Sequence, residues 1–274
     1  IRLEQGDFKA DYDGTNRLGN TRSTTATQSS PVSSSGYYFR GNVELNVAQA
    51  LRLPLMGVKP WNGLGGVQQL KDTAENIALG LKAFSEGQAL SFSKIVVSDS
   101  NPLIIDAATF YKLDYGVQNA NWSDTDGVEV LKSDGNKSDI KVTGSLSEFQ
   151  SAGLISSAGT FASKLTDKTN LVDQITTYTI SSSVTTDSEV IALSNVISNK
   201  PTGKTVSLSV DLSSDYGKNG LSSSAFISLA KLDAVSASDL IKDAFPSGVN
   251  IIDTADNIKT LLTSTDSAVI PVKD

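Results

Sequence analysis

Ser91 and Lys94 have a spacing that can support nucleophilic catalysis. When two such residues share one helical turn, the lysine amine can take the proton of the serine hydroxyl and activate its oxygen. Here the pair leads directly into Ile95-Val96-Val97, a run that predicts a β-strand rather than a helix. Serine and lysine are also frequent in this chain, so the spacing is expected by coincidence. We therefore assign no catalytic residue and predict no reaction that depends on Ser91 or Lys94.

Histidine and cysteine are absent from all 274 residues. Their absence removes serine–histidine and cysteine–histidine nucleophile pairs, and zinc sites built from those ligands. Gly203-Lys204-Thr205 ends like a phosphate-binding loop, but Ser198 stands where that loop needs its first glycine. A strand is also predicted where the loop needs a helix. We assign no cofactor-binding residue, and the protein is predicted not to be an enzyme.

The segment between residues 124 and 139 is rich in side-chain oxygen atoms and contains the candidate ligands of a metal ion. Calcium is the cation that fits such turns best, because it takes about six to eight oxygen ligands. The spacing does not follow the EF-hand loop pattern, so solvated turns capped by Asp and Asn side chains remain the alternative interpretation. The candidate calcium ligands are Asp124, Asp126, Asp134, Asn136 and Asp139.

Paired carboxylates offer a further chemistry, because an acid and a base flanking a glycosidic bond can hydrolyse a polysaccharide. Asp124 and Asp126 form such a pair in the sequence, and Trp61 and Trp122 can stack on sugar rings. Nothing in the sequence places two carboxylates across a cleft, and a loop tryptophan packed on the core explains the tryptophans equally well. A carboxylate-dependent enzyme acting on polysaccharide is therefore the third of three functional hypotheses.

The segment that begins at Asp72 predicts an amphipathic helix. Asp72-Thr73-Ala74-Glu75 fits an N-cap residue followed three positions later by an acid in the first turn. Ala74, Ile77, Leu81 and Phe84 then recur at the spacings of one apolar helical stripe. The stripe predicts that this helix is buried along one side.

Strands are predicted from two kinds of pattern. Ile95-Val96-Val97 and Leu103-Ile104-Ile105 are short apolar runs separated by a turn, and a short helix is expected at Ala107-Ala108-Thr109-Phe110. Between residues 206 and 210, valine and leucine alternate strictly with serine, which is the period of a half-buried strand.

The opening of the helix at 72–77 returns near the end of the chain. Residues 253–258 match it in five of six positions, and a Thr-x-x-Glu capping box at 186–189 begins a more distant copy. Two helices at equivalent places in copies of one α/β unit should each bury their stripe. We therefore predict that Ile77 and Ile258 are core residues.

Composition divides the chain near residues 60–70. Up to Gly66 the chain has seven basic and five acidic residues, including all five arginines, whereas 16 basic and 25 acidic residues follow. We predict three parts. Residues 1–66 form an N-terminal arm and hairpin region with a Ser/Thr-rich linker at 21–35; residues 67–165 form a first α/β repeat unit; residues 166–274 form a second repeat unit and a truncated third copy.

The partner classes are limited by charge and hydropathy. A net charge of −7 disfavours binding to phosphate backbones, and no basic stripe with interleaved aromatic residues is present. No apolar run reaches the roughly 18 residues that a membrane-spanning helix needs. We expect neither nucleic acid nor a membrane span.

The Asp-Thr-Ala-x-Asn-Ile helix, followed by an Ile/Val strand and Ser-Asp-Ser, resembles repeats of very large secreted bacterial proteins, including surface-layer and adhesin-like ones. The similarity covers residues 70–113, 186–232 and 251–262. It implies an α+β fold of irregular β-rich repeats with short capped helices and a mainly β N-terminal region. It also implies an extracellular or cell-surface structural protein that assembles with copies of itself into an open surface layer or filament.

Two alternatives to self-assembly remain open. An adhesin-type module would bind a cell-surface glycan or a protein through its loops, and a virion structural protein would share this composition. No calcium site follows from the resemblance, because Gly63-Leu64-Gly65-Gly66 lacks the aspartate that calcium-binding nonapeptide repeats place next.

Overall fold

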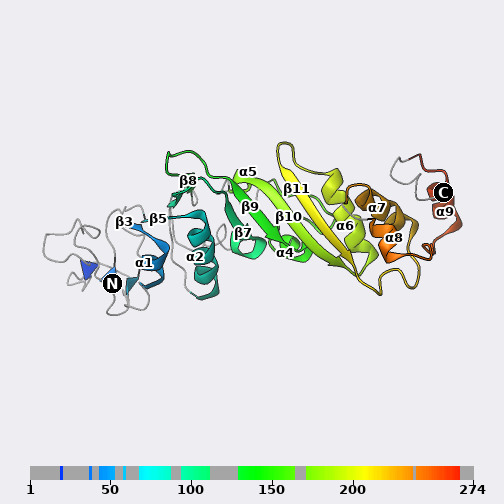
Figure 1. Cartoon of the computed structure of the whole chain (residues 1–274), viewed down its shortest axis with the longest axis horizontal. Coiled ribbons are helices and arrows are strands. Elements are labelled where there is room, and N and C mark those ends of the chain that lie inside the picture. The colour runs from blue at the N-terminus through cyan, green and yellow to red at the C-terminus, as the bar shows by residue number, and fades with distance from the viewer. Residues whose placement is uncertain are drawn as a thin grey trace, which may run out of the picture. The chain divides into compact units, whose positions relative to one another are not determined.

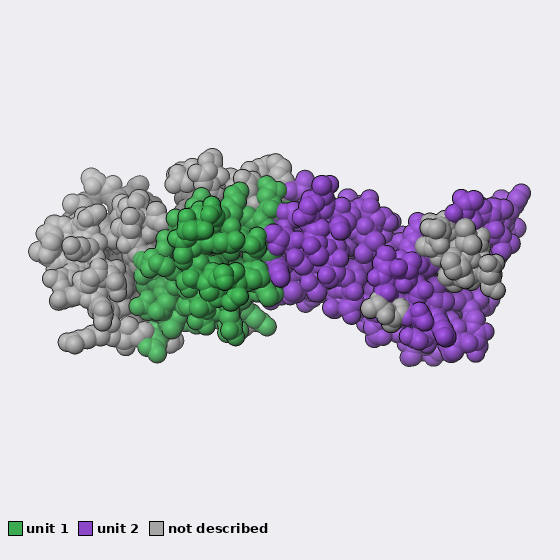
Figure 2. Space-filling view, turned by 45° about the horizontal axis from the view of Figure 1, so that its top comes forward, with its two compact units in different colours: residues 1–105, 109–140, 166–174 green, residues 106–108, 141–165, 175–274 purple. Residues whose placement is uncertain are grey.

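The computed structural model forms two compact units (Figures 1 and 2). Unit 1 comprises residues 1–105, 109–140 and 166–174, and unit 2 comprises residues 106–108, 141–165 and 175–274. The predicted boundaries at residues 66 and 165 stay a prediction. The structure describes residues 19–20, 37–38, 43–52, 58–59, 68–87, 94–111, 129–163, 171–236 and 239–265.

Helices and strands alternate through most of the described residues (Figure 1). The helices are α1 (Val47–Arg52), α2 (Ala74–Gly87), α4 (Leu146–Ser151), α5 (Leu171–Gln174), α6 (Asp187–Ser198), α7 (Ser223–Asp233), α8 (Leu240–Ala244) and α9 (Ala255–Leu262). The strands are β1 (Gly19–Asn20), β2 (Tyr37–Tyr38), β3 (Val43–Leu45), β4 (Val58–Lys59), β5 (Gln68–Asp72), β6 (Lys94–Val97), β7 (Leu103–Asp106), β8 (Glu129–Lys132), β9 (Ile140–Gly144), β10 (Ile175–Val184) and β11 (Thr205–Leu212).

The described strands build two parallel four-stranded sheets, with the orders β3-β5-β6-β8 and β11-β10-β9-β7. A smaller sheet has the order β1-β2-β4. The prediction of a mixed helix and strand fold is confirmed, but the prediction of irregular β-rich repeats was wrong. The architecture is consistent with α/β, because crossovers that include helices join parallel neighbours such as β3 and β5, and β10 and β11.

The core of unit 1 is a row of aliphatic side chains across its parallel sheet. Leu45 pairs with Leu70, Leu70 with Ile95, and Ile95 with Val130, and all four side chains are buried. Equivalent positions of parallel strands stand side by side on the same face, so one inward residue per strand gives a continuous ladder. Helix α2 adds Ile77 to the core of the described residues, fully buried as predicted.

In unit 2 the long pair of β10 and β11 keeps one register over eight residues, from Thr177 opposite Thr205 to Val184 opposite Leu212. Tyr178 and Ile180 are buried on one side of β10. Their neighbours Val206 and Leu208 on β11 are half-buried, because β11 is the last strand of the described sheet. The alternation predicted for 206–210 is confirmed.

Two local predictions need correction. Helix α2 begins at Ala74, so its N-cap is Thr73, whose hydroxyl accepts from Asn76 N–H at 3.3 Å, and not Asp72. In the N-terminal region, where a hairpin is predicted, the described strands Tyr37–Tyr38 and Val43–Leu45 do not pair with each other, because the first lies in the small sheet and the second in the first parallel sheet. Asp72 instead accepts from Thr73 N–H and Asn76 Nδ2 beside it and from Val47 N–H, 25 residues earlier.

Four further predictions concern the linker, a capping box, a short helix and membrane spans. The linker at 21–35 lies outside the described residues. The capping box at Thr186 and Glu189 is present, and residues 107–111 are helical as expected. Within the described ranges, every helix is too short or too polar to cross a bilayer.

Candidate functional site

The most distinctive arrangement of polar residues is a joint between consecutive helices, centred on Asp72 at the end of β5. Its Oδ1 accepts from Thr73 N–H at 2.8 Å and from Asn76 Nδ2 at 2.8 Å. Its Oδ2 accepts from the backbone N–H of Val47, the first residue of α1, at 3.1 Å. One carboxylate therefore fixes the start of its own helix and also caps the helix before it.

The same joint occurs around Asp253. Its Oδ1 accepts from Thr254 N–H and Asn257 Nδ2, both at 2.7 Å, and its Oδ2 accepts from Ser223 N–H at 2.8 Å. Ser223 is the first residue of α7, as Val47 is of α1. The repeated Asp-Thr-Ala-x-Asn sequence thus produces the same set of contacts in both places. We call these two arrangements the aspartate joints.

Hydrogen bonding holds both joint carboxylates in their charged form. Partial burial acts to raise the pKa of Asp72, but hydrogen bonds from Asn76, Thr73 and Val47 outweigh it and leave the pKa below its usual value. At Asp253 the hydrogen bond from Asn257, followed by those from Ser223 and Thr254 N–H, lowers the pKa to about 2. Both carboxylates therefore stay ionised and are poor candidates for a proton-transfer role at neutral pH.

Other helices receive related contacts. Ala74 N–H, at the start of α2, donates to Asp99 Oδ1 at 3.2 Å, and Leu146 N–H, at the start of α4, donates to Ser182 Oγ at 2.7 Å. In each case the acceptor follows the donor residue by 25 or more residues. Side chains from a later part of the chain therefore cap earlier helices in both units.

A polar cluster not anticipated from the sequence lies at the start of α6. Asp187 Oδ2 accepts from the backbone N–H of Ser222 at 3.1 Å and from its hydroxyl at 2.7 Å, while Oδ1 accepts from Tyr216 Oη at 3.2 Å. Burial, with the nearby Asp187 charge, raises the pKa of Tyr216. Ser222 is also the N-cap of α7, so its hydroxyl serves the helix and is not held for catalysis. A local sequence pattern could not predict this cluster, because its members are more than five residues apart in the chain.

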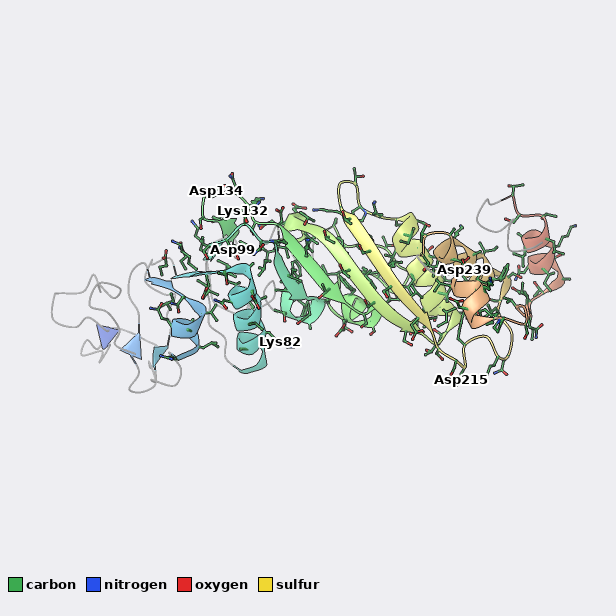
Figure 3. The ribbon with its side chains drawn as sticks, in the orientation of Figure 1. Lys82, Asp99, Lys132, Asp134, Asp215 and Asp239 are labelled. Atoms are coloured by element: carbon green, nitrogen blue, oxygen red, sulfur yellow. The ribbon has the colours of Figure 1, made fainter. Side chains whose placement is uncertain are left out.

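The predicted calcium ligands fall into two groups. Asp124 and Asp126 lie outside the described residues. Asp134 occupies the turn after β8 (Figure 3), where its two oxygens accept from Asn136 N–H and Nδ2, both at 2.9 Å. Asp139 instead forms an ion pair with Lys132 at 3.1 Å.

These contacts tie each described candidate to a local partner. In the parts of the chain that the structure covers, no three acidic side chains converge as metal ligands do. A calcium site at Asp134, Asn136 and Asp139 stays a prediction, and the described geometry matches the alternative of Asp- and Asn-capped turns.

The Ser-x-x-Lys motif and the Gly-Lys-Thr motif both lie next to strands. Lys94 is the first residue of strand β6, as expected, and Ser91 lies outside the described residues. Lys204 precedes strand β11 rather than a helix. Trp61 and Trp122 also lie outside the described residues.

A broad surface of hydroxyl groups covers the outward side of β10 and β11. Outward residues of the two strands stand in register, with Thr177 opposite Thr205, Thr179 opposite Ser207, and Ser181 opposite Ser209. All six are half or fully exposed, and none carries a charge, whereas the next outward pair, Ser183 opposite Asp211, adds one carboxylate at the end of the strands. Exposed sheet faces usually carry charged residues. We call these six residues the hydroxyl face.

Comparison with known proteins identifies no relative: no family description, no curated protein and no solved structure matches this chain.

Proposed function

We propose that this protein is a structural building block of an extracellular or cell-surface assembly, in which stacked α/β units form a scaffold. The observation that carries the proposal is the recurrence of the aspartate joint at Asp72 and Asp253. Each joint lies within one compact unit and ties the start of an earlier helix to a strand–helix segment that follows 25 to 30 residues later. A contact of this kind between successive segments favours repetition in one direction, as in solenoid proteins. Scaffolds that grow by repetition suit surface layers and filaments.

The chemistry of the polar clusters supports a non-enzymatic role. Asp72, Asp253 and Asp187 each accept three hydrogen bonds, and at least one donor to each is the backbone N–H of a residue that begins or caps an earlier or later helix. Carboxylates engaged in this way stabilise the fold and are not held ready for a substrate. We propose that the partners are copies of the same chain in an open assembly, with calcium as a candidate ligand.

An adhesin-type module is the second candidate, and the hydroxyl face favours it. A neutral surface of regularly spaced hydroxyl groups can donate and accept hydrogen bonds without burying a charge. A neutral glycan has the complementary chemistry. A carboxylate-dependent enzyme remains the third candidate, without a specific observation among the described residues in its favour.

Electron microscopy of the purified protein with and without calcium tests the first proposal. Ordered sheets or filaments in either condition are the expected result. If the protein stays monomeric in both conditions, the assembly proposal fails and the adhesin becomes the leading function.

A glycan-binding assay tests the second candidate. The double substitution Ser181→Lys/Ser209→Lys places two charges on the hydroxyl face and should abolish binding to neutral glycans. The control Ser157→Lys/Ser214→Lys adds the same charges at exposed serines elsewhere and should leave binding unchanged. Equal binding by both variants would remove the hydroxyl face from consideration.

A further inference from the structure

Equivalent residues of the two aspartate joints differ in exposure. An offset of 181 residues maps Asp72 onto Asp253, Ile77 onto Ile258, and Leu81 onto Leu262. Ile77 and Leu81 are buried, with exposures of 0% and 7%. Ile258 is half-buried and Leu262 is 66% exposed. Ile252, beside the second joint, is also 62% exposed. The second unit therefore has an apolar surface at a place where the first is covered.

In the first unit, the strand after the joint helix returns beside the joint. Strand β6 pairs with β5, so that Leu70 lies opposite Ile95 and Asp72 opposite Val97. Asp99 follows directly and accepts from Ala74 N–H at 3.2 Å. The element that follows the first joint and pairs beside it is thus a short aliphatic strand with an aspartate two residues after its end. Among the described residues, no carboxylate accepts from Ala255, the counterpart of Ala74.

The sequence contains a second element of this type. Ile270-Pro271-Val272-Lys273-Asp274 matches Ile95-Val96-Val97-Ser98-Asp99 in its inward aliphatic positions and its aspartate. Six residues separate the end of α2 from Lys94, and six separate the end of α9 from Val269, the counterpart of Lys94. The connection therefore has the length that the first unit uses to deliver its covering strand.

We propose that the surface formed by Ile252, Ala255, Ile258 and Leu262 is the docking site for the segment Ile270–Asp274 of the same chain. The register follows from the first unit: Ile270 pairs with Ile251, Val272 with Asp253, and Asp274 accepts from Ala255 N–H. Residues 266–274 lie outside the described residues, so this pairing is an inference from the first unit. It concerns a single chain and does not depend on the proposed function.

Pro271 should lower the affinity of the docked segment for its site, because it lacks a backbone N–H. Ser98 N–H donates to Asp72 O at 2.8 Å, and alternate residues of a parallel strand bond to the same neighbour, so Val96 N–H also faces β5. Pro271 stands in the position of Val96 and has no N–H to donate. Its segment therefore makes one ladder hydrogen bond fewer than β6. Replacing this proline should strengthen docking, whereas it should have no effect on a segment that does not dock.

Disulfide trapping tests the proposal directly, because the chain contains no cysteine. Ile252→Cys/Pro271→Cys joins the counterparts of Lys71 and Val96, which are register partners in the first unit. On mild oxidation of a dilute sample, we expect a disulfide within one chain. The control Leu79→Cys/Pro271→Cys uses an exposed aliphatic residue of similar exposure on α2 and should form none. Absence of the intrachain bond, or a bond only between two chains, would overturn the proposal.

Hydrogen exchange gives a second and independent test. Asp274→Ala should accelerate exchange of the Ala255 amide about tenfold, the effect of losing one hydrogen bond to a charged acceptor. Asp266→Ala removes an equivalent charge outside the proposed contact and should leave this amide unchanged. Pro271→Val should slow the exchange. Equal rates in all variants would show that Asp274 does not bind Ala255.

Discussion

The carboxylate of Asp253 accepts a hydrogen bond at 2.8 Å from the backbone N–H of Ser223, thirty residues earlier in the chain. The contact joins the start of α9 to the start of α7, and Leu261 of α9 packs on Phe226 and Ala230 of α7 beside it. The joint and this apolar contact together hold α7 and α9 against each other. The stability of α9 should therefore depend on Asp253.

Substituting Asp253 by alanine tests the joint. Asp253→Ala leaves Ser223 N–H, Thr254 N–H and Asn257 Nδ2 without their acceptor, so the amides of α9 should exchange faster with solvent. Asp256→Ala is a control, because it removes an exposed acid from the first turn of the same helix. Hydrogen exchange measured by mass spectrometry reports both variants. Matching exchange in α9 would mean that the joint does not hold this helix.

The joint also predicts a dependence of stability on pH. Because folding lowers the pKa of Asp253 to about 2 from an ordinary value of 3.8, the unfolded chain binds this proton more readily than the folded chain. The stabilisation is complete above about pH 4 and is lost as the pH falls through about 2. Urea midpoints measured across this range should fall less steeply for Asp253→Asn than for the parent protein. Parallel profiles would rule out this contribution.

Ile77 should be essential to the core of unit 1. Ile77→Ala removes a fully buried side chain and should lower the free energy of unfolding by about 2–5 kcal/mol. Leu79→Ala, two residues away, removes a side chain that is 63% exposed and should change it by no more than about 0.5 kcal/mol. Chemical denaturation measures both. Similar losses at the two positions would contradict the burial that places α2 on the sheet.

Gly159 should tolerate no side chain. Its φ is +82°, and a Cβ atom there would lie 2.1 Å from the carbonyl oxygen of Ala192. Gly159→Ala should therefore destabilise the protein by about 3 kcal/mol, from backbone strain and from the clash with α6. Gly203 has a similar φ of +75° but open space around it, so Gly203→Ala should cost only about 1 kcal/mol. Thermal unfolding of the two variants separates the steric part from the conformational part, and equal losses would disprove the contact.

The capping box of α6 gives a smaller expected effect. Thr186 Oγ1 accepts from Glu189 N–H, and Glu189 Oε2 accepts from Thr186 N–H at 3.0 Å. Thr186→Ala should lower the free energy of unfolding by about 1 kcal/mol. Thr202→Ala, in an exposed turn, is the matched control and should be neutral within error in the same denaturation experiment. A loss as large for Thr202→Ala would show that the box itself contributes nothing.

The sequence alone located the short-range features of this protein. The helices that follow Thr73, Thr186 and Thr254, and the strand at 206–210, were predictable because caps and periodicities of 3.6 and 2 lie within a few residues of one another. The likeness of residues 72–77 to residues 253–258 was visible for the same reason. The fully buried position of Ile77 followed from its place in the apolar stripe.

The tertiary structure decided every feature that depends on which strands become neighbours. Parallel pairing of β3, β5, β6 and β8 replaced the expected irregular repeats, and it brought Asp72 to the start of α1 at Val47. It also gave Asp134 and Asp139 different partners, since Asp134 binds Asn136 and Asp139 pairs with Lys132. Ile77 and Ile258 have nearly the same local sequence but different burial, because a residue's exposure depends on the element packed against it. Local patterns encode a helix and its buried side, whereas the partner that covers that side comes from a distant part of the chain.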